Sequence, residues 1–152
     1  MRISIASDHG GVELKKEIYN HLKEKGIEVT DLSPINDSND DYPTFAYVVG
    51  KSIQEKKADL GILVCRSGIG LSIAANKMQS VYCARITNFS EVELSCNHNG
   101  INCMSLAGDL MSIEEAIKSV DIFIESERLD SERHQRRFQK IIEIESRTYN
   151  GL

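Results

Sequence analysis

The sequence predicts an α/β fold in which a five-stranded parallel sheet is covered by helices on both faces. Short apolar segments alternate with longer amphipathic segments from one end of the 152-residue chain to the other. Apolar strands that alternate with helices are typical of a parallel sheet buried between two helical layers. We therefore expect a three-layer α/β/α, Rossmann-like arrangement that forms one domain over residues 1–152.

The elements follow from this alternation. The predicted strands are residues 2–6, 27–32, 60–64, 81–86 and 103–106, and the most apolar, 60–64, is placed at the centre of the sheet. The predicted helices carry apolar residues at helical spacing and comprise 12–25, a helix with Pro43 in its first turn, 70–77, 88–98, a helix that begins after Ser112, and 131–146. Ser112 and Glu115 match a capping box, Gly26 ends the first helix, and residues 33–41 predict a loop.

Composition excludes several classes of function. The net charge of −5 argues against nucleic acid as a partner, because such proteins need a basic face. No segment approaches the roughly 18 apolar residues that span a membrane, and the N-terminus does not resemble a signal peptide. The four cysteines lack CxxC spacing, so we expect no zinc site. We expect reduced thiols in the cytoplasm, with all but Cys65 filling the core.

The turn 65–70, Cys-Arg-Ser-Gly-Ile-Gly, follows the central strand and opens a helix. Unpaired N–H groups at a helix N-terminus attract an anion and lower the pKa of a nearby thiol. A Cys65 thiolate there suits proton abstraction next to a carbonyl, while the N–H groups bind the developing enediolate oxygen. A purely structural turn with a buried cysteine is the alternative, and spacing does not decide between them.

Two histidine motifs also have two interpretations each. In the segment 8–11 (Asp-His-Gly-Gly), His9 could bind phosphate or move a proton, whereas Asp8 could simply cap a helix beside an exposed histidine. His98, in the segment 97–99 (Asn-His-Asn), is a candidate general acid or base. Histidine and asparagine are equally common where a helix ends.

Two further features could contact a ligand. Arg133 and Arg137 are four residues apart and share one helix face, where two guanidinium groups can bind a phosphate together. The alternative is a solvated basic stretch among acidic residues. Tyr42 could stack on a sugar, or it could be an exposed loop tyrosine.

Together these motifs resemble the ribose-5-phosphate isomerase B family, which also contains the galactose-6-phosphate isomerases. The resemblance covers nearly the whole chain. The matching segments occur in the order of the family and are 7–11, 41–43, 65–70, 73–77, 98–99 and 133–137.

The resemblance implies an aldose–ketose isomerase that acts on ribose 5-phosphate through a cis-enediolate, without metal or organic cofactor. It implies that Cys65 is the base, that Ser67 moves the hydroxyl proton and that His98 opens the sugar ring. The other implied contacts are the backbone at Arg66, Gly68, Ile69 and Gly70, the substrate contacts Asp8 and Asn99, and the phosphate binders His9, Arg133 and Arg137. The family forms dimers or tetramers with shared sites, so the C-terminal helix is expected to take part in dimerisation.

The sequence departs from the family at Arg66, where glycine is usual, and at Asp109, where a phosphate-binding arginine is usual. Arginine would be strained if position 66 required a positive φ; otherwise its side chain projects toward the pocket. We expect Arg66 and Asp109 to form a compensating pair that reshapes the pocket, within one chain or across the dimer interface, with the two residues within about 8 Å of each other. The departures leave open a tetrose 4-phosphate, a hexose 6-phosphate such as galactose or allose 6-phosphate, and a non-catalytic binding subunit.

Overall fold

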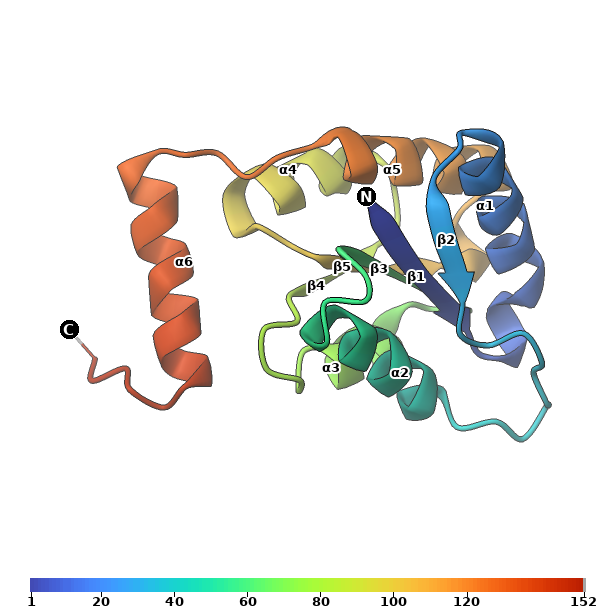
Figure 1. Ribbon diagram of the computed structural model, residues 1–152, viewed down its shortest axis with the longest axis horizontal. Helices are drawn as coiled ribbons and strands as arrows, with labels where there is room; N and C mark the ends of the chain where they lie inside the picture. Colours follow the sequence, from blue (N-terminus) through green and yellow to red (C-terminus); the bar gives the residue numbers. More distant parts are fainter. Residues whose placement is uncertain (152) are drawn as a thin grey trace.

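The computed structural model describes residues 1–151 and confirms the predicted fold class (Figure 1). All five strands are parallel, in the order β2-β1-β3-β5-β4. They are β1 (Arg2–Ser7), β2 (Glu28–Asp31), β3 (Leu60–Cys65), β4 (Cys83–Ile86) and β5 (Cys103–Ala107). The most apolar strand, β3, lies at the centre, as predicted.

Helices cover both faces of the sheet, which gives the three predicted layers. The helices are α1 (Val12–Glu24), α2 (Tyr42–Gln54), α3 (Ile69–Ala75), α4 (Ser90–Asn99), α5 (Ile113–Glu125) and α6 (Glu132–Glu145), with short 3-10 turns η1 (His9–Gly11) and η2 (Gly108–Leu110). Helices α1, α4 and α5 pack on one face, and α2 and α3 pack on the other.

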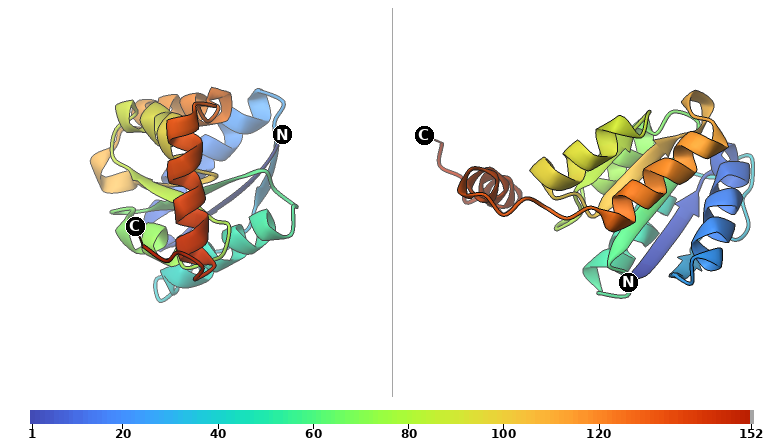
Figure 2. Two further views of the ribbon diagram at one scale, coloured as in Figure 1. Left: turned by 90° about the vertical axis from the view of Figure 1, so that its left-hand side faces the viewer. Right: turned by 90° about the horizontal axis from the view of Figure 1, so that it is seen from above.

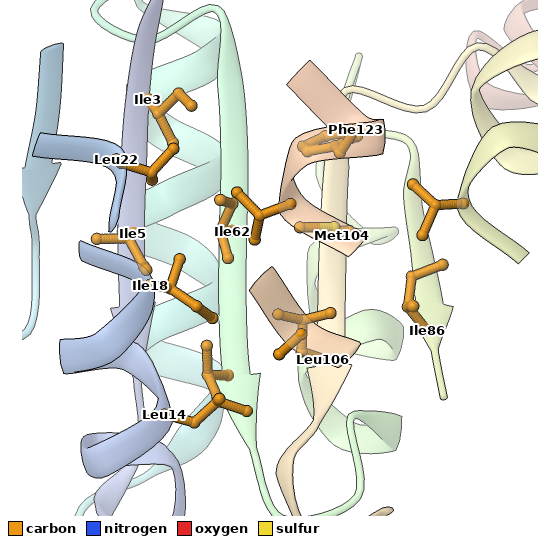
Figure 3. Packing of buried hydrophobic residues seen from close by; sticks show 14 of the residues in the cluster. Ile3, Ile5, Leu14, Ile18, Leu22, Ile62, Ile86, Met104, Leu106 and Phe123 are labelled. Atoms are coloured by element: carbon orange, nitrogen blue, oxygen red, sulfur yellow. The ribbon is translucent and has the colours of Figure 1, made fainter. Parts of the chain in front are cut away.

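The larger core cluster lies between the sheet and α1, α4 and α5 (Figure 3). Ile18 and Leu22, four residues apart on α1, are fully buried, and Phe123 of α5 is 1% exposed. Each such side chain contributes about 1.5–3 kcal/mol on burial. Cys83, Cys96 and Cys103 are also buried, which confirms them as core residues.

Local signals set the ends of several elements. Ser112 and Glu115 form the predicted capping box at the start of α5, and Gly26 (φ +73°) follows the end of α1. Strand β4 starts two residues later than predicted, because the N–H groups of Val81 and Tyr82 are bonded to a turn carbonyl and to the side chain of Asn102.

Helix α6 differs from the other helices because it stands beside the three layers (Figure 2). None of its residues is buried, and Ile144 is 60% exposed. Its contacts with the rest of the chain include an edge-to-face pair between Phe138 and Tyr82, with ring centroids 4.9 Å apart, and a hydrogen bond from the Ser80 N–H to Glu145 (2.7 Å). Within residues 1–151, no helix combines the length and apolar character needed to cross a membrane.

Candidate active site

The carboxyl ends of β1, β3 and β5 meet at one edge of the sheet. Ser7 lies beside Val64 on β3, and Cys65 lies beside Ala107 on β5. The residues that follow these strands therefore converge at the edge where parallel sheets bind ligands. This confirms the prediction that the segment 8–11 and the turn 65–70 lie at the same edge.

The Cys65 sulfur faces the start of α3. Its side chain is buried, and the sulfur accepts a hydrogen bond from the Gly68 N–H at 3.1 Å. Gly68 is the N-cap of α3 and has a φ of +71°, which favours glycine. A backbone donor of the predicted kind thus points at the thiol.

The carbonyl groups of the turn are held from outside it. Three successive carbonyl oxygens accept hydrogen bonds, from the Asp109 N–H to Arg66 (2.9 Å), from Arg85 Nε–H to Ser67 (2.7 Å) and from Ser105 Oγ–H to Gly68 (2.9 Å). The donors come from β4, β5 and the turn after β5. These bonds fix the peptide groups of the turn, in which the Gly68 N–H donates to Cys65 and the Ile69 N–H donates to Ser67 Oγ at 3.3 Å.

The pKa of Cys65 differs from the sequence prediction. Burial raises the pKa of the Cys65 thiol, and the charge of Asp8 adds to this effect. The N–H groups of Gly68, Ser67 and Leu71 act in the opposite direction but do not outweigh burial. The prediction that the turn lowers the pKa is therefore wrong for the net shift, because desolvation is the largest contribution.

Asp8 and His9 occupy the short turn after β1. Asp8 caps η1 by accepting the Gly10 N–H at 2.9 Å, which confirms its structural interpretation. Burial raises the pKa of Asp8, although the Gly10 N–H opposes this. His9 Nδ1 lies 3.0 Å from the Asp40 carboxylate, and Asn36 Nδ2–H donates to the same carboxylate at 3.1 Å. The predicted loop 33–41 therefore orients His9.

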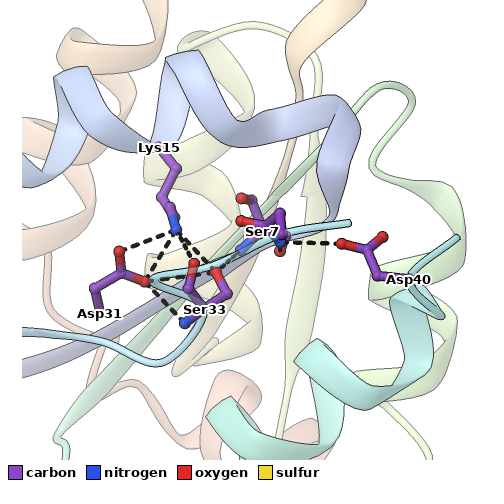
Figure 4. A network of polar contacts seen from close by, with 6 residues as sticks. Ser7, Lys15, Asp31, Ser33 and Asp40 are labelled. Atoms are coloured by element: carbon purple, nitrogen blue, oxygen red, sulfur yellow. Dashed lines mark hydrogen bonds and ion pairs between the residues drawn. The ribbon is translucent and has the colours of Figure 1, made fainter. Parts of the chain in front are cut away.

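A buried polar network anchors this loop beneath the site (Figure 4). Lys15, only 4% exposed, lies 2.9 Å from Asp31 and donates to Ser33 Oγ at 3.0 Å. Ser33 Oγ in turn accepts the Ser7 N–H at 2.8 Å. A buried lysine is stable only when it is paired in this way, so the network connects β1, α1 and the loop.

Tyr42 lies at the start of α2, close to the start of α3. A Cβ atom on Gly70 would come within 2.8 Å of the Tyr42 ring, so glycine is needed for this contact. Tyr42 is 45% exposed, and Ile69 next to the contact is 49% exposed. The side chain of Tyr42 is therefore positioned beside the turn and still accessible to a ligand.

Arg66 and Asp109 form an ion pair within one chain. Arg66 Nη1 lies 3.9 Å from Asp109 Oδ2, well inside the limit of about 8 Å set from the sequence. Arg66 has no positive φ, and its side chain lies against Gly10, where a Cβ atom would approach Arg66 Cγ to 2.7 Å. Both residues, with His9, line a cavity of about 520 Å³.

His98 and the two arginines form a separate group, which we name the corner cluster: His98, Asn99, Arg133, His134 and Arg137. The rings of His98 and His134 are stacked, with centroids 4.7 Å apart and planes 15° apart. Burial, and then the neighbouring His98, Arg133 and Arg137, lower the pKa of His134. His98 and Asn99 end α4 before Gly100 in the left-handed conformation, as the structural interpretation predicted.

One chain does not bring the corner cluster to Cys65. His98 lies in the last turn of α4, shortly before β5 begins, whereas Cys65 lies beside the last residue of β5. Strand β5, Cys103–Ala107, spans roughly 13 Å at 3.3 Å per residue. The corner cluster therefore lies at the amino edge of the sheet, and the group around Cys65 lies at the carboxyl edge.

Arg85 and Asp40 were not among the site residues predicted from the sequence. Arg85 is a charged residue inside an otherwise apolar strand, one position before the carboxyl end of β4. That position was a usable signal, because a cation at this edge lies beside the ligand site. Asp40 gave no comparable signal among the other polar residues of its loop. In residues 1–151 no group of three histidine, cysteine or acidic side chains is placed to bind a metal ion.

Comparison with known proteins agrees with this geometry. The sequence model of the Ribose/Galactose Isomerase family matches residues 3–141. A probable ribose-5-phosphate isomerase B from Mycoplasma genitalium is 42% identical over 148 residues, which cover 96% of this chain and 97% of that protein.

Solved structures give the same result. Ribose-5-phosphate isomerase B from Clostridium thermocellum has a TM-score of 0.92 at 37% identity and covers 98% of this chain and 100% of its own. The Mycoplasma genitalium enzyme with bound ribulose-5-phosphate has a TM-score of 0.90 at 41% identity, over 95% of this chain and 96% of its own. The chain belongs to the ribose/galactose isomerase family.

Proposed function

We propose that this chain is an aldose–ketose isomerase that interconverts ribose 5-phosphate and ribulose 5-phosphate. The observation that carries the proposal is the hydrogen bond from the Gly68 N–H to the Cys65 sulfur. It lies in a turn in which the carbonyls of residues 66–68 accept hydrogen bonds from other elements. A ribulose-5-phosphate complex of a protein 41% identical to this chain supports the choice of substrate. Cytoplasmic location remains a prediction.

In the proposed reaction, the Cys65 thiolate removes the proton from C2 of the open-chain aldose. The electron pair forms the C1–C2 double bond of a cis-enediolate, and the N–H groups of the turn stabilise its negative oxygen. The Ser67 hydroxyl moves a proton between O1 and O2, and the Cys65 thiol returns its proton to C1. No electrons or atoms are left over, so the step needs no cofactor.

The remaining roles require a second copy of the chain. The corner cluster lies at the opposite edge of the sheet from Cys65, so His98 and Asn99 of one copy would complete the site of the other. Arg133 and Arg137, on the unburied helix α6, would bind the phosphate together with His9. Exposed Ile141 and Ile144 give α6 an apolar surface for this dimer contact.

Hydrogen exchange tests the proposal directly. The protein is incubated in D₂O with phosphates of four-, five- and six-carbon sugars, and deuterium incorporation at C1 and C2 is followed by NMR. We expect exchange with ribose 5-phosphate that is lost in Cys65→Ala. Exchange with a tetrose or hexose phosphate alone would reassign the substrate, exchange that survives in Cys65→Ala would remove Cys65 as the base, and binding without exchange would indicate a non-catalytic subunit.

A further inference from the structure

We propose that Arg85 is a positioning residue, which holds the Ser67–Gly68 peptide so that its N–H donates to the Cys65 sulfur. This inference rests on the proposed role of Cys65 as the base. It is independent of the identity of the sugar, because it concerns a bond between β4 and the turn.

The geometry of one peptide unit carries the inference. The carbonyl of Ser67 and the N–H of Gly68 belong to the same planar group and point in opposite directions, since no peptide bond in the described residues is cis. Arg85 Nε–H donates to that carbonyl at 2.7 Å, and the Gly68 N–H donates to Cys65 Sγ at 3.1 Å. Arg85 and the sulfur therefore bind opposite ends of one dipole.

This arrangement affects the site in two ways. A peptide next to glycine can rotate at low cost, and Gly68 at φ +71° has that freedom, so the bond to Arg85 keeps the N–H aimed at the sulfur. A charged donor on the carbonyl also polarises the amide, which strengthens its N–H as a donor to a thiolate.

The side chain of Arg85 is exposed, but its stem contacts the turn. A Cβ atom on Gly68 would approach Arg85 Cγ to 3.3 Å, so the stem of the arginine lies against the turn itself. Within residues 1–151, no carboxylate lies within 4.0 Å of its guanidinium group, so its positive charge is not neutralised by an ion pair. Asp8 is the charged side chain that acts on the Cys65 sulfur directly, and it disfavours the thiolate.

The test measures the ionisation of Cys65 without any substrate. The rate of alkylation of Cys65 by iodoacetamide is followed across pH by mass spectrometry of its peptide, in wild type, Arg85→Leu, Arg85→Gln and Arg85→Lys. We expect Arg85→Leu to raise the midpoint by about one pH unit, which slows alkylation about tenfold below the midpoint. The midpoint of Arg85→Lys should lie closer to that of the wild type than the midpoint of Arg85→Leu does. The midpoint of Arg85→Gln should lie between those of Arg85→Lys and Arg85→Leu.

The matched control is Lys23→Leu, which removes the same charge from an exposed position at the end of α1. A midpoint unchanged in Arg85→Leu, or shifted equally in Lys23→Leu, overturns the inference. If circular dichroism shows that Arg85→Leu does not fold, Arg85→Gln replaces it.

With ribose 5-phosphate as substrate, we expect Arg85→Leu to lower kcat about tenfold and to leave KM within about threefold of the wild-type value. A wild type that does not isomerise any sugar phosphate would refute the proposed function, whereas the alkylation result would still decide the role of Arg85.

Discussion

The group around Cys65 and the corner cluster differ in how their residues are held. Around Cys65, each carbonyl from Arg66 to Gly68 is bonded to another element, and Cys65 itself is buried. In the corner cluster the two arginines lie on α6, which has no buried residue. One group is ordered by its own chain, whereas the other presents its side chains outward.

This difference has a physical reason. Stabilising the charge that develops in a transition state requires donors that do not have to reorganise, so the turn is built at the edge of a packed sheet. A phosphate carries its charge throughout the reaction and is bound by exposed guanidinium groups. The proposed dimer would combine the two groups, and the following predictions test that division.

The largest expected effect is on catalysis. We expect Cys65→Ala and His98→Ala each to lower kcat by about 100-fold to 10,000-fold, because each removes a proton-transfer group. When the two inactive proteins are mixed and allowed to exchange subunits, about a quarter of the wild-type activity should return, since random pairing gives half heterodimers with one intact site each. Mixtures that stay inactive would place both residues of a site in one chain.

The next effect concerns stability. We expect Phe123→Ala to lower the free energy of unfolding by about 3–5 kcal/mol at every protein concentration, because it opens a cavity in the core. Ile144→Ala, its control on the exposed face of α6, should act only through dimer formation. Urea denaturation at several protein concentrations would then show that the difference in stability between Ile144→Ala and the wild type depends on protein concentration. A loss of stability in Ile144→Ala that does not depend on protein concentration would contradict a role of α6 in dimer formation.

A smaller effect is expected at the ion pair. If Arg66 contributes positive charge to the phosphate, Arg66→Gln should raise KM about tenfold with little change in kcat. The double variant Arg66→Gly with Asp109→Arg moves the guanidinium group to the other position and should restore KM to within about threefold. Steady-state kinetics with ribose 5-phosphate would measure both. Equal KM values in the wild type, in Arg66→Gln and in the double variant would show that Arg66 and Asp109 have no role in substrate binding.

The smallest effect tests an ion pair between α1 and α5 that belongs to neither group. Burial would raise the pKa of Asp121, but hydrogen bonds from His21 and Lys25 outweigh it and hold this pKa below its usual value. Such a carboxylate stabilises the fold above its unfolded pKa, and the stabilisation is lost as the pH falls through the folded pKa. We expect Asp121→Asn to cost about 1 kcal/mol at pH 7 and the difference to vanish in acid. Activity per folded molecule should not change.

Much of the fold could be predicted because its signals are local. Alternating apolar segments gave the sheet and its layers, and Ser112, Gly26 and Pro43 marked helix ends through their own backbone chemistry. The strand ends also placed Cys65 and Asp8 at one edge. What could not be predicted was the balance at the Cys65 sulfur, because burial depends on every element packed around it.

The sequence alone therefore determined which residues could do chemistry and at which edge of the sheet the turn lies, since periodicity and turn chemistry are properties of short segments. Only the tertiary structure decided which of them meet. It brought Arg85 from β4 to the Ser67 carbonyl, and it placed His98 at the opposite edge from Cys65. Those distances depend on strand order and register, which join segments far apart in the chain.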